Sequence, residues 1–173
     1  MKMYNKYSAR FRNGYKFLWP IIIAPVMILG GVLLLSDATT DHELLVDFFA
    51  ALAISSLWIV PTLYIHIQYY RANRGDTMDV DLHSETIKLL HHAERLNIRF
   101  AEIRRLVRYK TPGLVRRKTG WTPWGKYNHA RIVLDDAREI VITCFLADEF
   151  DLPINDDKKE LIQVLYPRIR GRW

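Results

Sequence analysis

The sequence predicts a membrane-embedded helical hairpin followed by a small, mainly β domain with one α-helix at its C-terminal end. Three observations support this fold class. Two long apolar runs lie in the first 70 residues, segments of alternating apolar and polar residues fill most of the remainder, and one late stretch has helical spacing. With 173 residues, the chain has room for about one ordinary domain beyond the hairpin.

The two apolar runs are long enough to cross a bilayer. Residues 17–35 carry no charge and, at about 1.5 Å per helical residue, reach about 28 Å, close to the thickness of the hydrocarbon core. Residues 48–65 form the second run, which a more amphipathic segment extends to residue 70. We therefore expect a transmembrane hairpin over residues 17–70, with helices at about 17–35 and 48–70 and an external loop at about 36–47.

The charges that flank these runs predict the orientation of the hairpin. Residues 1–16 contain five Lys or Arg and no acidic residue, whereas residues 36–47 contain four acidic residues and no Lys or Arg. Short segments rich in Lys and Arg stay in the cytoplasm. We therefore expect a multi-pass protein of the cytoplasmic (inner) membrane, with the basic segment 1–16 and both termini in the cytoplasm.

The rest of the chain, about residues 76–173, is expected to form one cytoplasmic domain. Apolar and polar residues alternate with a period of two, which is typical of half-buried antiparallel strands. These segments are residues 78–82, 86–92, 95–100, 106–111, 129–134 and 139–145. Near the end, Asp157 and Glu160 suit a capping box, Leu161 and Leu165 line one helical face, and Pro167 would end the helix. Six or seven strands and one C-terminal α-helix follow from this pattern.

This order of elements resembles the pleckstrin-homology-like (PH-like) domain found in bacterial membrane proteins that carry a two-helix hairpin. The segment LNIRFAEIRRL, residues 96–106, is similar to a strand and its continuation in those domains. The long insertion between the fourth and fifth strands departs from the compact version. The resemblance implies a PH-like fold over about residues 77–170 and a binding or scaffolding module, not an enzyme. It implies no particular ligand.

Motifs for catalysis and for cofactor binding are missing from the sequence. It contains no P-loop, no dinucleotide-binding glycine motif, no zinc-protease motif and no serine-hydrolase elbow. The single cysteine, Cys144, excludes an internal disulfide and a cysteine-cluster zinc site. His91 and His92 are neighbours in a predicted strand, so their side chains point to opposite faces and cannot share a metal. We therefore expect no enzyme activity, no cofactor and no metal.

A basic stretch, residues 104–127 (RRLVRYKTPGLVRRKTGWTPWGKY), is the strongest candidate for a binding site. It carries eight basic and four aromatic residues and no acid. A short connection from the second apolar run would hold it near the inner leaflet, where anionic lipids attract Lys and Arg by about 1 kcal/mol each. The candidates for binding anionic lipid or a partner are Arg108, Arg116, Arg117, Lys118, Trp121, Trp124 and Lys126. A solvated loop without a ligand and an acidic protein partner remain alternatives, while the membrane tether makes nucleic acid an unfavourable partner.

Small residues on both apolar runs indicate close packing of helices. Gly30 and Gly31 are adjacent on the first run, and Ala51 and Ser55 lie one turn apart on the second. They can pack the two helices against each other, or they can contact a membrane-protein partner or a second copy of the chain. The sequence as a whole favours a non-enzymatic accessory or scaffold subunit that organises a membrane complex. A sensor of anionic lipid headgroups is the alternative.

Overall fold

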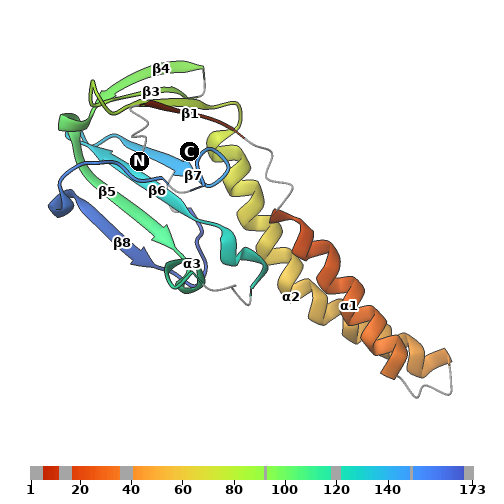
Figure 1. Cartoon of the computed structure of the whole chain (residues 1–173). Coiled ribbons are helices and arrows are strands. Elements are labelled where there is room, and N and C mark those ends of the chain that lie inside the picture. Colours follow the sequence, from red (N-terminus) through yellow and green to blue (C-terminus); the bar gives the residue numbers. More distant parts are fainter. Residues whose placement is uncertain are drawn as a thin grey trace.

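A β sandwich and a helical hairpin that projects from it make up the molecule (Figure 1). This computed structural model describes residues 6–11, 17–35, 41–91, 93–117, 122–148 and 150–169.

The sandwich consists of two four-stranded sheets. The first has the order β1-β2-β3-β4, is antiparallel throughout, and contains β1 (Lys6–Arg10), β2 (Thr77–Asp81), β3 (Thr86–His91) and β4 (Glu94–Arg99). The second has the order β7-β6-β5-β8 and contains β5 (Ile103–Lys110), β6 (His129–Leu134), β7 (Glu139–Thr143) and β8 (Lys159–Gln163). Short helical turns connect the strands: η2 (Phe100–Glu102), α3 (Pro112–Val115), η3 (Pro123–Lys126) and η4 (Asp156–Lys158).

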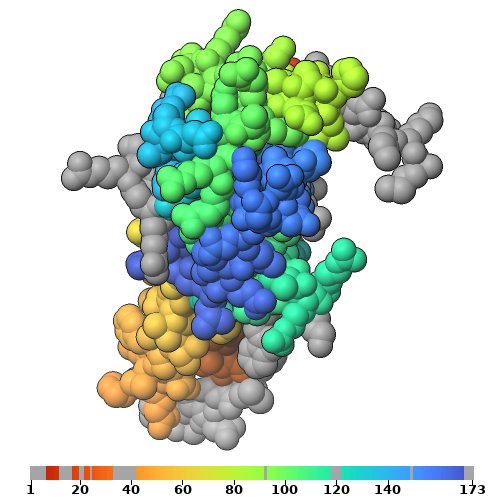
Figure 2. All heavy atoms as spheres, turned by 90° about the vertical axis from the view of Figure 1, so that its left-hand side faces the viewer, coloured from red at the N-terminus to blue at the C-terminus, as the bar shows by residue number. Residues whose placement is uncertain are grey.

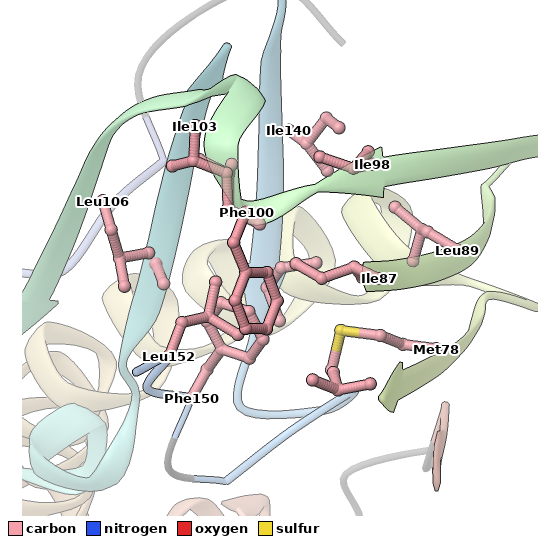
Figure 3. Close-up of a cluster of buried hydrophobic side chains, with 14 of the residues drawn as sticks. Met78, Ile87, Leu89, Ile98, Phe100, Ile103, Leu106, Ile140, Phe150 and Leu152 are labelled. Carbon is pink, nitrogen blue, oxygen red and sulfur yellow. The ribbon is translucent and has the colours of Figure 1, made fainter. Parts of the chain in front are cut away.

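Alternating apolar residues from both sheets fill the space between them. In β3, Ile87 and Leu89 are buried while Lys88 between them is exposed, because successive side chains of a strand point to opposite faces. Figure 3 shows these side chains meeting those of the second sheet around Phe100, which joins the two sheets at the turn between β4 and β5. Apolar burial of this kind stabilises a fold by about 25 cal/mol per Å². The period-two segments predicted from the sequence are confirmed as β2 to β7.

Two helices, α1 (Trp19–Leu35) and α2 (Asp41–Asn73), pack side by side in the projecting hairpin (Figure 1). The 33 residues of α2 correspond to about 50 Å of helix. Large apolar side chains are exposed along most of this length, from Leu44 to Ile67. Within the described part of the chain, one helix is long and apolar enough to cross a membrane, judged by length and composition: residues His42–Asn73 of α2. Helix α1 is shorter, with 17 residues.

The C-terminal turns of α2 are part of the domain core. Ile65, Tyr69 and Ala72 are buried against Tyr127 and Phe145 in a second apolar cluster. The helix ends at Asn73, and Gly75, with φ of +80°, adopts the left-handed conformation that turns the chain directly into β2. In place of a short connection after residue 70, a continuous helix therefore holds the domain.

The predicted C-terminal α-helix is wrong. Residues 159–163 form β8 instead, which pairs in parallel with β5 from Leu106↔Lys159 to Lys110↔Gln163. The strand satisfies the backbone groups along the edge of β5, which would otherwise lack partners in the sheet. The apolar side chains that the predicted helix would bury are exposed instead: Leu161 is 44% exposed and Leu165 is 80% exposed.

The structure also moves two boundaries. β1 pairs with β2, so the sheet includes residues 6–10, which the sequence analysis assigned to a separate basic segment ahead of a domain at 76–173. α2 begins at Asp41, inside the expected external loop of 36–47, while residues 36–40 lie outside the described residues. Acidic residues such as Glu43 near the start of a helix interact favourably with its dipole, which explains why this polar segment is helical.

Candidate functional site

The largest set of polar and aromatic contacts between distant parts of the chain lies where α2 enters the domain. We call this region the junction; it comprises residues 58–73 of α2, the residues of the domain that contact them, and Phe17, which packs against the same cluster. Aromatic rings form its centre: the ring of Phe17 lies 4.9 Å from that of Tyr127 and 5.3 Å from that of Phe145, and Tyr69 lies 5.8 Å from Phe145. Such edge and tilted pairs add stability beyond the burial of their area.

A hydrogen-bonded pair, Tyr69 and His129, joins α2 to β6 inside the junction. The Tyr69 hydroxyl lies 2.8 Å from the carbonyl oxygen of Pro167 and 2.9 Å from Nδ1 of His129. Because a carbonyl only accepts, Tyr69 donates to Pro167, and the Nδ1–H of His129 donates to the Tyr69 oxygen. Burial, and secondly the positive charge of Arg131, lower the pKa of His129 to about 3, so its ring is neutral near pH 7.

A second polar contact ties the end of α2 to the edge of β7. The side-chain amide of Asn73 donates to the carbonyl oxygen of Val141 at 2.9 Å and accepts from the backbone N–H of Thr143 at 2.8 Å. The same amide nitrogen donates to Asp76 at 2.9 Å, and Asp76, which is 1% exposed, also contacts Nδ1 of His91 at 2.7 Å. Asn73 therefore fixes the edge strand, the turn after α2 and the helix itself.

The junction extends about 22 Å along α2 from Asn73 towards its N-terminus, as far as Trp58. There the rings of Trp58 and Trp124 lie 6.0 Å apart, and Nε1 of Trp124 donates to the carbonyl oxygen of Leu165 at 2.9 Å. One turn closer to the domain, the hydroxyl of Tyr166 donates to the carbonyl oxygen of Pro61 at 2.8 Å. η3 and the segment after β8 are thus held against the exposed apolar part of α2.

The structure separates the residues predicted to bind headgroups. Arg108 forms an ion pair with Asp151 at 2.9 Å and is largely covered, and Trp124 belongs to the junction. Arg116 and Arg117, after α3, and Lys126, at the end of η3, are exposed. Lys118 and Trp121 lie outside the described residues. Figure 2 shows the segment around α3 projecting from the domain beside the C-terminal segment, on the side where the hairpin begins.

The predicted packing residues have different surroundings. Ala51 and Ser55 are 2% and 4% exposed, and α1 is the described element that lies beside this part of α2 (Figure 1). A Cβ added at Gly30 or Gly31 would meet nothing within 4 Å. The contact between α1 and α2 therefore uses the small residues of α2 and does not require the glycines of α1.

Chemically reactive groups are few in the described part of the chain. No group of three or more His, Cys, Asp or Glu there could hold a metal ion. Burial raises the pKa of the Cys144 thiol to about 12, so it is protonated at neutral pH. Sequence reasoning missed Tyr69, Asn73 and His129, because the hydrogen bonds that tie α2 to β6 and β7 join residues at least 60 positions apart and local patterns carry no sign of such contacts.

The comparisons with known proteins agree with this architecture. A family model described as a PH domain matches residues 3–153, a range that starts ahead of β1 and runs through the hairpin and seven strands of the sandwich. No curated protein and no solved structure is significantly similar to the chain. The match covers most of the 173 residues and includes both the strand before the hairpin and those after it. The chain therefore belongs to the PH domain family.

Proposed function

We propose that the protein is a non-enzymatic scaffold subunit of a membrane complex. In this proposal, α1 and α2 both span the cytoplasmic membrane, both termini lie in the cytoplasm, and the PH domain binds a partner protein at the inner surface. A fold of this kind hosts many functions, so the proposal depends on the geometry of this chain and not on the family alone.

The pairing of β1 with β2 carries the proposal of two spans. These strands lie on opposite sides of the hairpin in the sequence, yet they pair residue by residue from Lys6↔Asp81 to Arg10↔Thr77. The chain therefore leaves the domain and returns to the same domain. Since the two ends of α2 lie about 50 Å apart, a membrane crossed by α2 must also be crossed by the chain that leads to its start.

The position of the exposed apolar surface supports the same arrangement. From Leu44 to Ile67, large apolar side chains of α2 are exposed over about 35 Å, enough for a tilted helix to cross a hydrocarbon core of about 30 Å. The contacts of the domain begin at Trp58 and continue to Asn73. The domain would then lie directly on the cytoplasmic surface of the bilayer.

Two features favour a scaffold. The junction packs α2 into the domain core, so the orientation of the domain relative to the hairpin is fixed, as a subunit that positions a partner requires. Gly30 and Gly31 leave open space beside α1, and small residues let a helix of another membrane protein approach closely.

Labelling of single cysteines tests the two spans. In a Cys144→Ala background, we expect His42→Cys, at the start of α2, to react with a membrane-impermeant maleimide in intact cells. Ser8→Cys in β1 and Lys88→Cys in β3 should react only after the membrane is opened. If Ser8→Cys and His42→Cys both react in intact cells, or both react only after the membrane is opened, a hairpin that crosses twice would be contradicted.

Purification in a mild detergent tests the scaffold. We expect the wild-type chain to copurify with a membrane-protein partner in fixed stoichiometry, and Gly30→Leu to lose it while the hairpin stays folded. Ala53→Leu, at an exposed position of α2, is the matched control and should retain the partner. A chain that is monomeric and free of any partner in native membranes would rule out the scaffold.

A second candidate function, binding of anionic lipid headgroups by the stretch 104–127, is favoured by one observation. Arg116, Arg117 and Lys126 are exposed near the part of the domain that contacts the apolar surface of α2. In the full-length protein, a photoreactive anionic lipid should label this stretch more than a zwitterionic one does. Changing these three residues to Gln should weaken labelling by roughly two orders of magnitude, at about 1 kcal/mol per charge. Equal labelling of wild type and variant would leave the scaffold as the single proposal.

A further inference from the structure

We propose that α2 carries a binding site for the phosphate of an anionic glycerophospholipid of the cytoplasmic leaflet, held by Arg71 and Arg74. The inference goes beyond the proposed scaffold, although it rests on the proposed membrane-spanning hairpin. The site is separate from the basic stretch 104–127 and is built on the last turns of α2 and the turn that follows the helix.

A groove of about 480 Å³ marks the site on α2. Among the described residues, its lining consists of His66, Ile67, Tyr70, Arg71 and Arg74. An apolar side chain, two aromatic rings and two guanidinium groups therefore meet in one hollow. That combination fits a molecule with a charged head and an apolar tail.

The two arginines give the groove its charge. Arg71, in the last turn of α2, and Arg74, in the turn directly after the helix, are both exposed and both line the groove. The guanidinium of Arg74 lies 5.5 Å from the centre of the Tyr70 ring, a contact that orients it. In the described part of the chain, neither arginine forms an ion pair, and no acidic residue lines the groove. Paired guanidinium groups recognise phosphate oxygens through short, charge-assisted hydrogen bonds.

The position of the groove along the helix axis matches the level of the lipid headgroups in the proposed membrane. Leu63, Ile67 and Arg71 follow one another on one side of the helix and Arg74 lies in the turn after it, so the exposed surface changes from apolar to cationic towards the domain. Arg71 lies about 6 Å beyond Ile67 along the axis. The headgroup layer adds roughly 5–8 Å to each side of the hydrocarbon core, and arginine side chains can extend along the helix to adjust their level.

The packing of α2 against the domain leaves this surface of the helix exposed to lipid in the proposed membrane. Tyr69 and Ala72, which lie between the groove residues in sequence, and Ile65, directly before them, are buried by the domain. The groove side remains exposed and continues the apolar surface of Leu63 and Ile67 that would contact acyl chains. A phospholipid can occupy both parts at once, with its chains on the apolar residues and its phosphate between the arginines.

Native mass spectrometry of the full-length protein tests the site. Wild type, purified in a mild detergent, would be titrated with a phosphatidylglycerol and, separately, with a phosphatidylcholine. We expect the phosphatidylglycerol to bind more tightly, and Arg71→Gln/Arg74→Gln to weaken its binding about 30-fold, as expected for two cations near the headgroup. Arg71→Lys/Arg74→Lys keeps the charges but lacks the guanidinium donors, so its affinity should lie between those of wild type and the Gln variant. The matched control is Arg95→Gln/Arg104→Gln, two exposed arginines of β4 and β5, which should bind like wild type.

Three outcomes would overturn the site. Equal binding of phosphatidylglycerol by wild type and by Arg71→Gln/Arg74→Gln would show that these arginines do not bind the lipid. Equal affinity for the two lipids would remove the selectivity for anionic headgroups. Loss of all binding in Arg116→Gln/Arg117→Gln alone would assign the lipid to the basic stretch. None of these results affects the hairpin, which the cysteine labelling tests separately.

Discussion

At the edge of β7, the side chain of Asn73 makes the backbone hydrogen bonds that a neighbouring strand makes elsewhere in the sheet. Its single amide group accepts from one backbone N–H of that strand and donates to one backbone carbonyl, two residues apart. Edge strands with unpaired backbone groups are prone to pair with other chains. A side chain that supplies both bonds covers the strand and attaches it to α2 at the same time.

Replacing Asn73 by alanine should therefore cost more than an ordinary polar substitution. The change removes three hydrogen bonds among buried groups, and we expect the free energy of unfolding to fall by about 3 kcal/mol. Chemical denaturation of the full-length protein in detergent would measure it. Asn97→Ala, at an exposed position of β4, is the control, and an equal, small effect of both changes would contradict the role of Asn73.

His129 predicts a dependence of stability on pH. Its pKa is about 3 in the folded protein and about 6.5 in the unfolded chain, so the unfolded chain binds the extra proton between these values. The stabilising contribution of neutral His129 is complete above pH 6.5 and declines by about 1.4 kcal/mol per pH unit as the pH falls towards 3. Unfolding measured from pH 7.5 to 5 should show this slope. His129→Gln should flatten it, whereas the exposed His83→Gln should leave it unchanged; the same slope in all three proteins would assign the effect to other groups.

At the scale of elements, β8 makes a testable contrast with the helix predicted for the same residues. In a helix, Leu161 would line the buried face, and its loss would cost about 2–5 kcal/mol. In the strand Leu161 is exposed, so Leu161→Thr should cost about 0.5 kcal/mol or less. Leu106→Ala, in the core of the adjacent β5, should cost the larger amount and serves as the reference. A large loss for Leu161→Thr would contradict the strand.

The sequence predicts elements well where local patterns decide them. The period of two in β3 and β6 reflects one face that lies in the core and one that is less buried, so both strands follow from the residues alone. β1 is harder to predict in this way, because only Tyr7 and Ala9 carry its alternation and its partner strand, β2, lies on the other side of the hairpin in the sequence. Residues 159–163 follow a helical spacing, but the free edge of β5 determines their conformation.

The candidate site shows the same limit. Composition located a basic stretch and its aromatic residues, but it could not predict that Arg108 pairs with Asp151 or that Trp124 stacks near Trp58. Both contacts join residues more than 40 positions apart. The sequence alone gives Arg71 and Arg74 no binding role, because only the structure shows that they line one groove with Ile67 and Tyr70.

At the scale of the whole molecule, the domain and the hairpin form a single folding unit. The fragment 76–169, close to the domain that the sequence delimits, lacks β1 and the buried residues Ile65, Tyr69 and Ala72 of α2. We expect it to unfold without a cooperative transition and to expose apolar surface to a hydrophobic dye, while the full-length protein in detergent unfolds cooperatively. A sharp thermal transition of the fragment alone would show that the sandwich is independent of α2.

The position of β1 ahead of the hairpin has a consequence for biosynthesis. At about 5–20 residues per second, the ribosome needs roughly 4–14 s to add the roughly 70 residues that separate this strand from its partner. During that time β1 has no sheet to join, and the sandwich cannot close until both helices have been made. If the helices cross the membrane as proposed, a chain in which only one of them inserts leaves β1 and β2 in different compartments. Such a half-inserted chain could not complete the domain, so folding of the domain would act as a checkpoint on insertion of the second helix.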